Sequence, residues 1–239
     1  MARKKRGWLG RWLRWTLVVL LAALGAAAAW VALTWPDVAA LATTNPTSTA
    51  FIDAARARGD RVEWRWVPYD EISRELAKAV VAAEDMSFFS HRGFDTHELR
   101  IAVREAVQGE RVRGASTITQ QLAKNLWLSP SRSPLRKLRE VVLTWQLERN
   151  LPKRRILELY LNVAQFGPTT YGAEAAARRY FGIPASVLDA DQAAALAASL
   201  PRPASWHPGV DTRGYRQAVA RVRARAEQSG WLDRLLSES

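Results

Sequence analysis

The longest apolar run of the chain lies close to its N-terminus. From Trp15 to Trp35 there is no charged side chain. An α-helix rises about 1.5 Å per residue, so a helix over this run would be about 30 Å long, the thickness of a bilayer core. The pattern therefore predicts a transmembrane anchor over residues 15–35.

The residues on either side of this run predict its orientation. Residues 1–14 contain six Lys and Arg side chains and no Asp or Glu, and such basic flanks stay in the cytoplasm. We therefore expect a cytoplasmic basic flank over 1–14 and the chain after Pro36 outside. The alternative is a cleaved signal peptide, since Ala26–Ala29 are small enough for a signal peptidase. The apolar run continues to Trp35, however, which favours an uncleaved anchor.

The pattern changes twice after the anchor. Residues 43–50, with the sequence TTNPTSTA, are rich in Thr, Ser and Pro and have no periodicity, which is typical of a spacer. We expect a stalk or linker over residues 36–60 and one domain over residues 61–239. Residues 61–70, RVEWRWVPYD, alternate enough to form a short strand or extended arm at the start of that domain.

Helical periodicity begins at Asp70. Ile72, Leu76 and Val80 recur at every fourth position, with Asp70 as the expected N-cap, and the same stripe continues to Glu84. Further helices are expected from an Asp95/Glu98 capping box to Gly109, through Ile118, Leu122 and Leu126, over 135–151, from Pro152 through 156–162, up to a C-cap at Gly182, over 191–199 and over 212–230. The fold class is therefore mainly α, with almost no strand.

Composition and charge narrow the classes of function. Cysteine is absent, which excludes a disulfide framework and a thiolate metal site. The net charge is +12, of which six basic residues belong to the flank, so about +6 remains on the rest. Because that part is expected outside the cytoplasm, its charge favours anionic lipid surfaces or phosphorylated substrates over nucleic acid. Simple solubility is the alternative explanation.

Glu84 is the first candidate for chemistry. A carboxylate at the end of an apolar helix face is partly desolvated, and desolvation raises its pKa towards neutrality, where it can act as a general acid or base. The alternative is a structural carboxylate that is bonded to the next turn or paired with Arg92. His91 and His97 are too far apart for one helical turn, so a two-histidine metal site is not expected.

Three further stretches carry polar groups in helical patterns. Thr117, Gln120, Gln121 and Lys124 share one helix face, which suits sugar hydroxyls and phosphate oxygens or else solvent. Arg136 and Glu140 form an i, i+4 pair, either an ordinary ion pair or a second carboxylate across a cleft from the first. Glu158, with Asn162 one turn later, is flanked by apolar residues and is expected to brace the core or the site.

Read in order, these stretches resemble the motifs of the bacterial peptidoglycan glycosyltransferases, the lysozyme-like domain of class A penicillin-binding proteins. The matching segments are EDMSFFSHRG (84–93), GASTITQQLAKN (114–125), RKLRE (136–140), ILELYLN (156–162) and AAARRYFG (175–182). The similarity extends from about Trp66 to Pro208. The Ser-x-x-Lys and Lys-Thr-Gly motifs of the transpeptidase domain do not occur in the sequence, so the resemblance is to the monofunctional members.

The resemblance implies roles for individual residues. Glu84 would be the general base that takes a proton from the acceptor sugar's 4-hydroxyl, and Glu140 would assist departure of the lipid diphosphate. Thr117, Gln121, Lys124 and Arg136 match positions that contact the donor. Asp85, Phe88 and His91 match positions that shape the site. The other residues expected to contact substrate are Ser116, Gln120, Asn125, Lys137, Glu158 and Asn162.

The resemblance also implies the reaction and its partners. The substrates would be lipid II and the growing β-1,4 glycan strand, joined with inversion at the outer face of the inner membrane, with release of undecaprenyl diphosphate. Membrane lipids and cell-wall synthesis proteins are the expected partners. Mg²⁺ or another divalent cation bridged by the substrate diphosphate is an expected cofactor, with no organic cofactor and no dedicated protein metal site.

Two departures from the family pattern and two rival functions stay open. Ile183 stands where relatives often have a basic residue, and Thr169 and Thr170 stand where they often have Gly. These departures put local diphosphate contacts and loop geometry in doubt. A lytic enzyme of the same broad fold would cut finished glycan instead of building it, and a non-enzymatic membrane scaffold would keep the helices but leave Glu84 inert.

Overall fold

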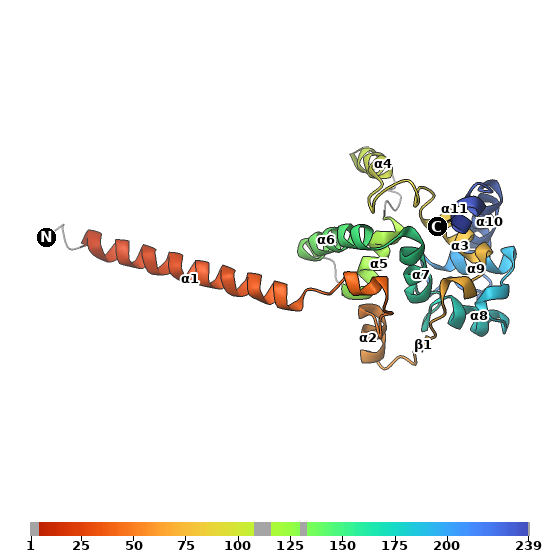
Figure 1. Ribbon diagram of the computed structural model, residues 1–239, viewed down its shortest axis with the longest axis horizontal. Helices are drawn as coiled ribbons and strands as arrows, with labels where there is room; N and C mark the ends of the chain where they lie inside the picture. Colours follow the sequence, from red (N-terminus) through yellow and green to blue (C-terminus); the bar gives the residue numbers. More distant parts are fainter. Residues whose placement is uncertain (1–4, 108–115, 130–132, 239) are drawn as a thin grey trace. The chain divides into compact units, whose positions relative to one another are not determined.

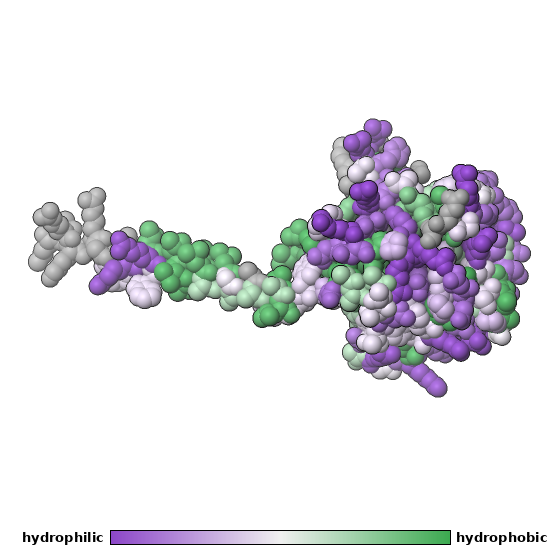
Figure 2. Space-filling view, viewed as in Figure 1, coloured by the Kyte–Doolittle hydropathy of each residue, from purple (hydrophilic) through white to green (hydrophobic). Residues whose placement is uncertain are grey.

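The computed structural model describes residues 5–107, 116–129 and 133–238. The chain divides into two units, one that ends at Asp37 and one that begins at Val38 (Figure 1). Helix α1 (Lys5–Thr34) makes up most of the first unit, and those of its apolar side chains that the structure describes are exposed (Figure 2). Within the described residues, 11–42 is the stretch long and apolar enough to cross a membrane, a test that a signal sequence also passes. Arg3 and Lys4 of the expected flank lie outside the described residues.

The second unit is mainly helical, as expected. Its α-helices are α2 (Ala50–Ala57), α3 (Arg74–Glu84), α4 (Thr96–Val107), α5 (Ile118–Trp127), α6 (Pro134–Asn150), α7 (Lys153–Val163), α8 (Ala173–Phe181), α9 (Ala190–Ser199), α10 (Arg213–Gln228) and α11 (Leu232–Glu238). Its 3-10 turns are η1 (Ala39–Ala42), η2 (Tyr69–Glu71) and η3 (Ala185–Val187). Strands β1 (Glu63–Trp64) and β2 (Thr170–Tyr171) pair in parallel, so the expected arm at 61–70 does contain a short strand.

Helix α3 forms the centre of one half of the core. It packs against α9, α10 and α11, and Leu76 and Val80 are fully buried. The expected N-cap at Asp70 is wrong, because Asp70 belongs to η2 and pairs with Arg154 on the surface. Ser73 caps the helix instead by accepting a hydrogen bond from the backbone N–H of Glu75. The N-cap therefore lies three residues later than expected, and the helix still ends at Glu84.

Helix α5 forms the centre of the other half. It packs against α2, α6 and α7, and Ile118, Leu122 and Leu126 are buried as the period predicts. Asp95 caps α4 by accepting hydrogen bonds from the backbone of His97 and Glu98. The expected end of that helix at Gly109 lies outside the described residues. The predicted C-cap at Gly182 is confirmed, since this residue ends α8 with a left-handed φ of 71°.

The region expected as a stalk, residues 36–60, differs from that expectation. Val38 and Leu41 are buried, and Ile52 and Ala55 on α2 have no exposed surface. Helix α2 begins at a threonine N-cap, Thr49. Thr and Ser are common both in spacers and at helix N-caps, so composition alone does not distinguish the two. The domain therefore begins near Val38.

One arginine holds the start of this region against α7. The guanidinium of Arg155 donates to the carbonyl oxygens of Leu41 and Thr44 and to the side chain of Asn45, at 2.7–2.9 Å. These contacts satisfy backbone oxygens that a free linker would leave to water. Residues 38–57 are thus part of the domain that carries the site.

Asn162 fastens the extended arm to α7. Its side chain has no exposed surface, and it exchanges two hydrogen bonds with the backbone of Val67, at 2.9 and 3.0 Å. Its own carbonyl oxygen accepts from the indole N–H of Trp64. Gly172 lies so close that an added Cβ would stand 2.6 Å from that same oxygen, so this junction tolerates only glycine there.

Replacing Asn162 with alanine is expected to lower the free energy of unfolding by about 3 kcal/mol, because it leaves two buried backbone groups of Val67 without partners. Thermal unfolding of the detergent-purified protein measures this. Asn150→Ala is the matched control, since Asn150 is exposed on α6 and a change there is expected to stay within about 0.5 kcal/mol. Equal effects of the two variants would show that Asn162 does not fasten the arm.

Candidate active site

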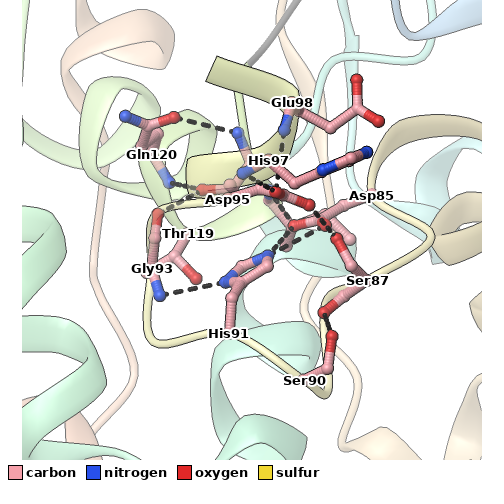
Figure 3. A network of polar contacts seen from close by, with 12 residues as sticks. Asp85, Ser87, Ser90, His91, Gly93, Asp95, His97, Glu98, Thr119 and Gln120 are labelled. Atoms are coloured by element: carbon pink, nitrogen blue, oxygen red, sulfur yellow. Dashed lines mark hydrogen bonds and ion pairs between the residues drawn. The ribbon is translucent and has the colours of Figure 1, made fainter. Parts of the chain in front are cut away.

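Asp85 joins the end of α3 to the start of α5. It is buried, and its carboxylate accepts a hydrogen bond of 3.0 Å from the backbone N–H of Ile118, the first residue of α5. The same carboxylate accepts from Nε2 of His91, at 3.0 and 3.1 Å. Nδ1 of that ring accepts from the backbone N–H of Gly93 (Figure 3). Because Nδ1 accepts, the proton of a neutral His91 lies on Nε2.

Packing and a hydrogen bond hold the loop that follows Asp85 against the rest of the domain. Phe88 has no exposed surface, and the ammonium of Lys153 lies 4.4 Å from its ring centre. Thr117 donates to the carbonyl oxygen of Gly93 at 2.7 Å. Asp85, Phe88 and His91 therefore lie together after the end of α3, and a role for them in shaping the site stays a prediction. The expectation that Phe88 contacts substrate does not fit its position, because its ring is covered by the protein.

Glu84 lies at the last residue of α3, partly buried beside α5. Its Oε2 accepts a 2.7 Å hydrogen bond from the side-chain amide of Gln121. Its partner is thus Gln121, whereas Arg92 is exposed. Burial raises the pKa of Glu84 above the ordinary value for a carboxyl, and the Gln121 hydrogen bond and the charge of Lys124 oppose that rise. A carboxyl whose pKa is raised in this way keeps its proton to higher pH than an ordinary carboxyl does.

The polar stripe on α5 divides into two pairs with different surroundings. Thr117 and Gln120 are buried and form a reciprocal capping box at the start of the helix. Gln121 and Lys124 lie one turn further on and face the carboxylates. The sequence pattern predicted one recognition face, and half of that face instead stabilises the helix start. Ser116 and Thr117 also line the cleft described below, and Asn125 is half-buried.

A second carboxylate and a group of cations come together on α6. Glu140 is buried and accepts from Arg136 at 2.9 Å and from Lys137. Burial lowers the pKa of Lys124, while the negative charges of Glu140 and Glu84 oppose that effect. Lys124 therefore interacts electrostatically with both carboxylates. Residues from α3, α5 and α6 thus form one charged site, which the separate motifs alone could not establish.

Glu158 and Asn162 lie outside this charged site. Glu158 pairs with Arg155 at 2.9 Å, and Asn162 holds Val67 as described. Asn162 braces the scaffold, whereas the ion pair of Glu158 lies within its own helix, α7, so the bracing role expected of Glu158 stays a prediction. The expectation of substrate contact does not fit Asn162, because its polar atoms are buried and bonded to the protein.

A cleft of about 900 Å³ opens beside Glu84. The loop after α3 and the first turn of α4 form part of its wall, and Arg225 on α10 and Trp231 before α11 also line it. Trp231 is half exposed. Sequence reasoning missed both residues, because they belong to no motif. An isolated tryptophan next to an otherwise polar helix was the one signal for them.

The carboxylates do not fit a divalent-ion site as they stand. Both oxygens of Glu140 are engaged by cations, and one oxygen of Glu84 accepts from Gln121. Among the described residues no group of three or more acids or histidines could hold a metal. The Nε of Arg136 is buried and has no acceptor within the described residues, which fits a phosphate oxygen better than a metal.

Comparison with known proteins shows the family of the chain. A family model described as transglycosylase matches residues 32–228. A protein of Azoarcus sp. is 47% identical over 206 residues, covering 83% of this chain and 86% of that protein. One from Thiobacillus denitrificans is 47% identical over 186 residues, covering 75% and 80%, and one from Ralstonia nicotianae is 52% identical over 167 residues, covering 66% and 71%. All three are named biosynthetic peptidoglycan transglycosylase. With these matches and the charged site that unites its motifs, the chain belongs to the transglycosylase family.

Proposed function

We propose that this protein is a peptidoglycan glycosyltransferase that joins lipid II units into β-1,4 glycan and releases undecaprenyl diphosphate. The observation that carries the proposal is the electrostatic interaction of Lys124 with both Glu84 and Glu140, in a site that also contains the cation of Arg136. A partly desolvated carboxyl therefore lies next to a group of cations. This is the pair of features needed for attack by a hydroxyl and departure of a diphosphate.

The proposed reaction assigns each step to a residue. Glu84 takes the proton of the acceptor's 4-hydroxyl as that oxygen forms a bond to the donor's anomeric carbon. The bond from that carbon to the diphosphate oxygen breaks, and the electron pair leaves with the diphosphate. Lys124 and Arg136 stabilise the negative charge that develops there. Attack opposite an α-linked leaving group gives the β-product in one displacement.

The cations also distinguish this proposal from a lytic enzyme. Cleavage of finished glycan releases a sugar hydroxyl, which needs a proton donor and no fixed cations. In this site Arg136 and Lys137 surround Glu140 so closely that both of its oxygens are engaged. That arrangement favours an anionic leaving group. The scaffold alternative gives no reason to keep Glu84 partly buried with a raised pKa.

An exposed apolar face on α6 supports a lipid-linked substrate. Leu135, Leu138, Val142 and Trp145 recur at positions that share one side of the helix, and all are exposed. Leu135 and Leu138 flank Arg136 and Lys137, the cations expected to contact the substrate. Such a face suits the hydrocarbon boundary of a bilayer, with basic residues at the headgroups. We propose that the domain works at the surface of the inner membrane.

The anchor gives this proposal an orientation. Helix α1 carries Arg11 and Arg14 near its start and is apolar afterwards, so its N-terminus is expected in the cytoplasm and the domain outside. Protease added to intact spheroplasts should then remove the domain. Protection of the domain would contradict this orientation. The sequence contains neither transpeptidase motif, and we propose glycan synthesis without cross-linking.

The test is to incubate detergent-purified protein with labelled lipid II and to resolve the products on a gel. Long glycan chains are expected, and soluble fragments are expected to be absent when finished glycan is supplied. Fragments from finished glycan without polymer from lipid II would favour the lytic enzyme. No product from either substrate would favour the scaffold. A parallel series with EDTA and added Mg²⁺ tests the prediction that a divalent cation bridged by the substrate takes part.

A further inference from the structure

A buried tyrosine is connected to the candidate base, Glu84, through one side chain that lies between them, and it has no part in the proposed reaction. Tyr160 on α7 has only 1% of its surface exposed. Its hydroxyl donates a 2.8 Å hydrogen bond to Oε1 of Gln121, whose Nε2 donates 2.7 Å to Glu84. A line of two hydrogen bonds therefore runs from α7 through α5 to the end of α3.

The chemistry of an amide gives this line a direction. A glutamine side chain has one acceptor oxygen and one donor nitrogen. When Tyr160 donates to the oxygen of Gln121, the nitrogen has to face Glu84. Burial raises the pKa of Tyr160 well above its ordinary value, so the phenol keeps its proton and remains a donor. If the amide turned over, its oxygen would face a carboxylate and the phenol proton would lose its acceptor.

We propose that Tyr160 is a positioning residue that holds the Gln121 amide with its N–H towards Glu84, and so keeps Glu84 available as a base. The inference rests on the proposed function, because it assigns Glu84 the base. The Gln121 hydrogen bond favours the ionised carboxylate and opposes the effect of burial. Loss of the tether is therefore expected to raise the pKa of Glu84 further and to leave less carboxylate at neutral pH.

Other groups near Glu84 stay in place when the tyrosine hydroxyl is removed. The charged neighbours of Glu84 are Asp85 from the end of its own helix and Lys124 from α5. The other titratable or charged groups that line the cleft beside Glu84 are His91, Asp95, His97, Glu98 and Arg225. Since Tyr160→Phe removes one oxygen atom and no charge, a change in the titration of Glu84 would be traced to the Gln121 amide.

The test is the pH dependence of polymer formation by Tyr160→Phe. We expect kcat at neutral pH to fall about fivefold, the change that corresponds to one typical hydrogen bond, with little change in KM. The acidic limb of the profile should move to higher pH, so that activity recovers as pH rises. A fall in kcat with an unmoved limb, or an unchanged kcat, would overturn the proposal.

Tyr215→Phe is the matched control. Tyr215 is also buried, at 5% exposed, and its hydroxyl donates to a backbone oxygen, that of Ala195, at 2.9 Å. The two variants delete the same atom from the same kind of hydrogen bond. Tyr215→Phe is expected to lower thermal stability comparably while the pH profile stays that of the wild type. A shift of the limb in both variants would mean a general effect of destabilisation.

A double-mutant cycle tests whether Tyr160 acts through Gln121. When Gln121 is already alanine, Tyr160→Phe should cause no further shift of the acidic limb, because the group that it positions is absent. Additive shifts would contradict a shared path. The single variant Gln121→Ala is expected to show the larger loss, since it removes the donor itself.

A second readout separates this inference from the proposed function. The difference in melting temperature between Glu84 and Glu84→Gln chains, followed against pH, reports the titration of Glu84 without any substrate. Its midpoint should lie at higher pH in the Tyr160→Phe background. If the wild type makes no polymer but the midpoint shifts, the proposed reaction fails and the positioning role stands. If polymer forms but the midpoint does not shift, the positioning role fails.

Discussion

Replacing Glu84 with glutamine is expected to lower kcat for glycan formation by about 10²- to 10⁴-fold, the usual contribution of a general base. Glutamine has nearly the same shape and can still hydrogen-bond to Gln121, but it cannot take a proton. The loss is measured as the initial rate of glycan formation, with labelled lipid II as substrate and the products resolved on a gel. Polymer formed at a rate near that of the wild type would show that another group accepts the proton.

The pH dependence of the wild type should agree with this loss. A general base works only when ionised, so the rate should fall as pH decreases through the raised pKa of Glu84.

The melting temperature of Glu84→Gln is the control for misfolding. A carboxyl whose pKa is raised by folding stabilises the protein below its unfolded pKa, and this contribution is lost as pH rises through the folded pKa. Glu84→Gln should therefore melt at or above the wild-type temperature at neutral pH, and this difference should vanish in acid. A lower melting temperature at neutral pH would mean that the lost activity reflects misfolding.

Replacing Lys124 with methionine is expected to lower kcat by about 10²- to 10³-fold, as when one preorganised group that stabilises developing charge is lost. Methionine keeps much of the length of the side chain and removes the charge that interacts with both Glu84 and Glu140. Because Lys124 lowers the pKa of Glu84, the acidic limb of the pH profile should also move to higher pH. Initial rates with labelled lipid II across a pH series measure both effects.

Arg221→Met is the matched control for Lys124→Met. Arg221 is exposed on α10, and its loss removes the same charge from the domain. If the net charge of the domain merely attracts anionic lipid, both variants should slow the reaction alike, and the loss should shrink in detergent without anionic lipid. A specific role predicts a large loss for Lys124→Met alone. Equal losses would therefore contradict the role given to Lys124.

Periodicity predicted much of the helical framework. The four-residue spacing of Ile72, Leu76 and Val80 predicted α3 and its end at Glu84, although the helix itself begins only at Arg74, after Ile72. Local signals predicted the caps at Asp95 and Gly182, because such residues act on their own helix end, but the same kind of signal was wrong at Asp70. Local signals failed where one residue type is common in two different kinds of structure. Thr49 starts a packed helix, although the residues around it have the composition of a spacer.

The candidate site was predicted residue by residue but not as an arrangement. Motifs indicated Glu84, Gln121, Lys124, Arg136 and Glu140. Which of these meet, and which serve the scaffold, depended on how the helices pack. Thr117 and Gln120 share a helix face with Gln121, yet they form a capping box. Arg225 and Trp231 reach the cleft from the C-terminal helices without any motif.

The sequence by itself determined the helical class, the apolar anchor pattern, the membership of a family and the types of residue that carry charge and hydrogen bonds. Only the tertiary structure decided that Tyr160 and Glu84 meet the same amide, since Gln121 lies 39 residues before Tyr160 and 37 after Glu84. Periodicity describes the faces of single helices, and the distances between α3, α5 and α7 follow from how their buried side chains fit together. Electrostatics at Glu84 depends on those distances and on burial, so its pKa became interpretable only once the helices were in place.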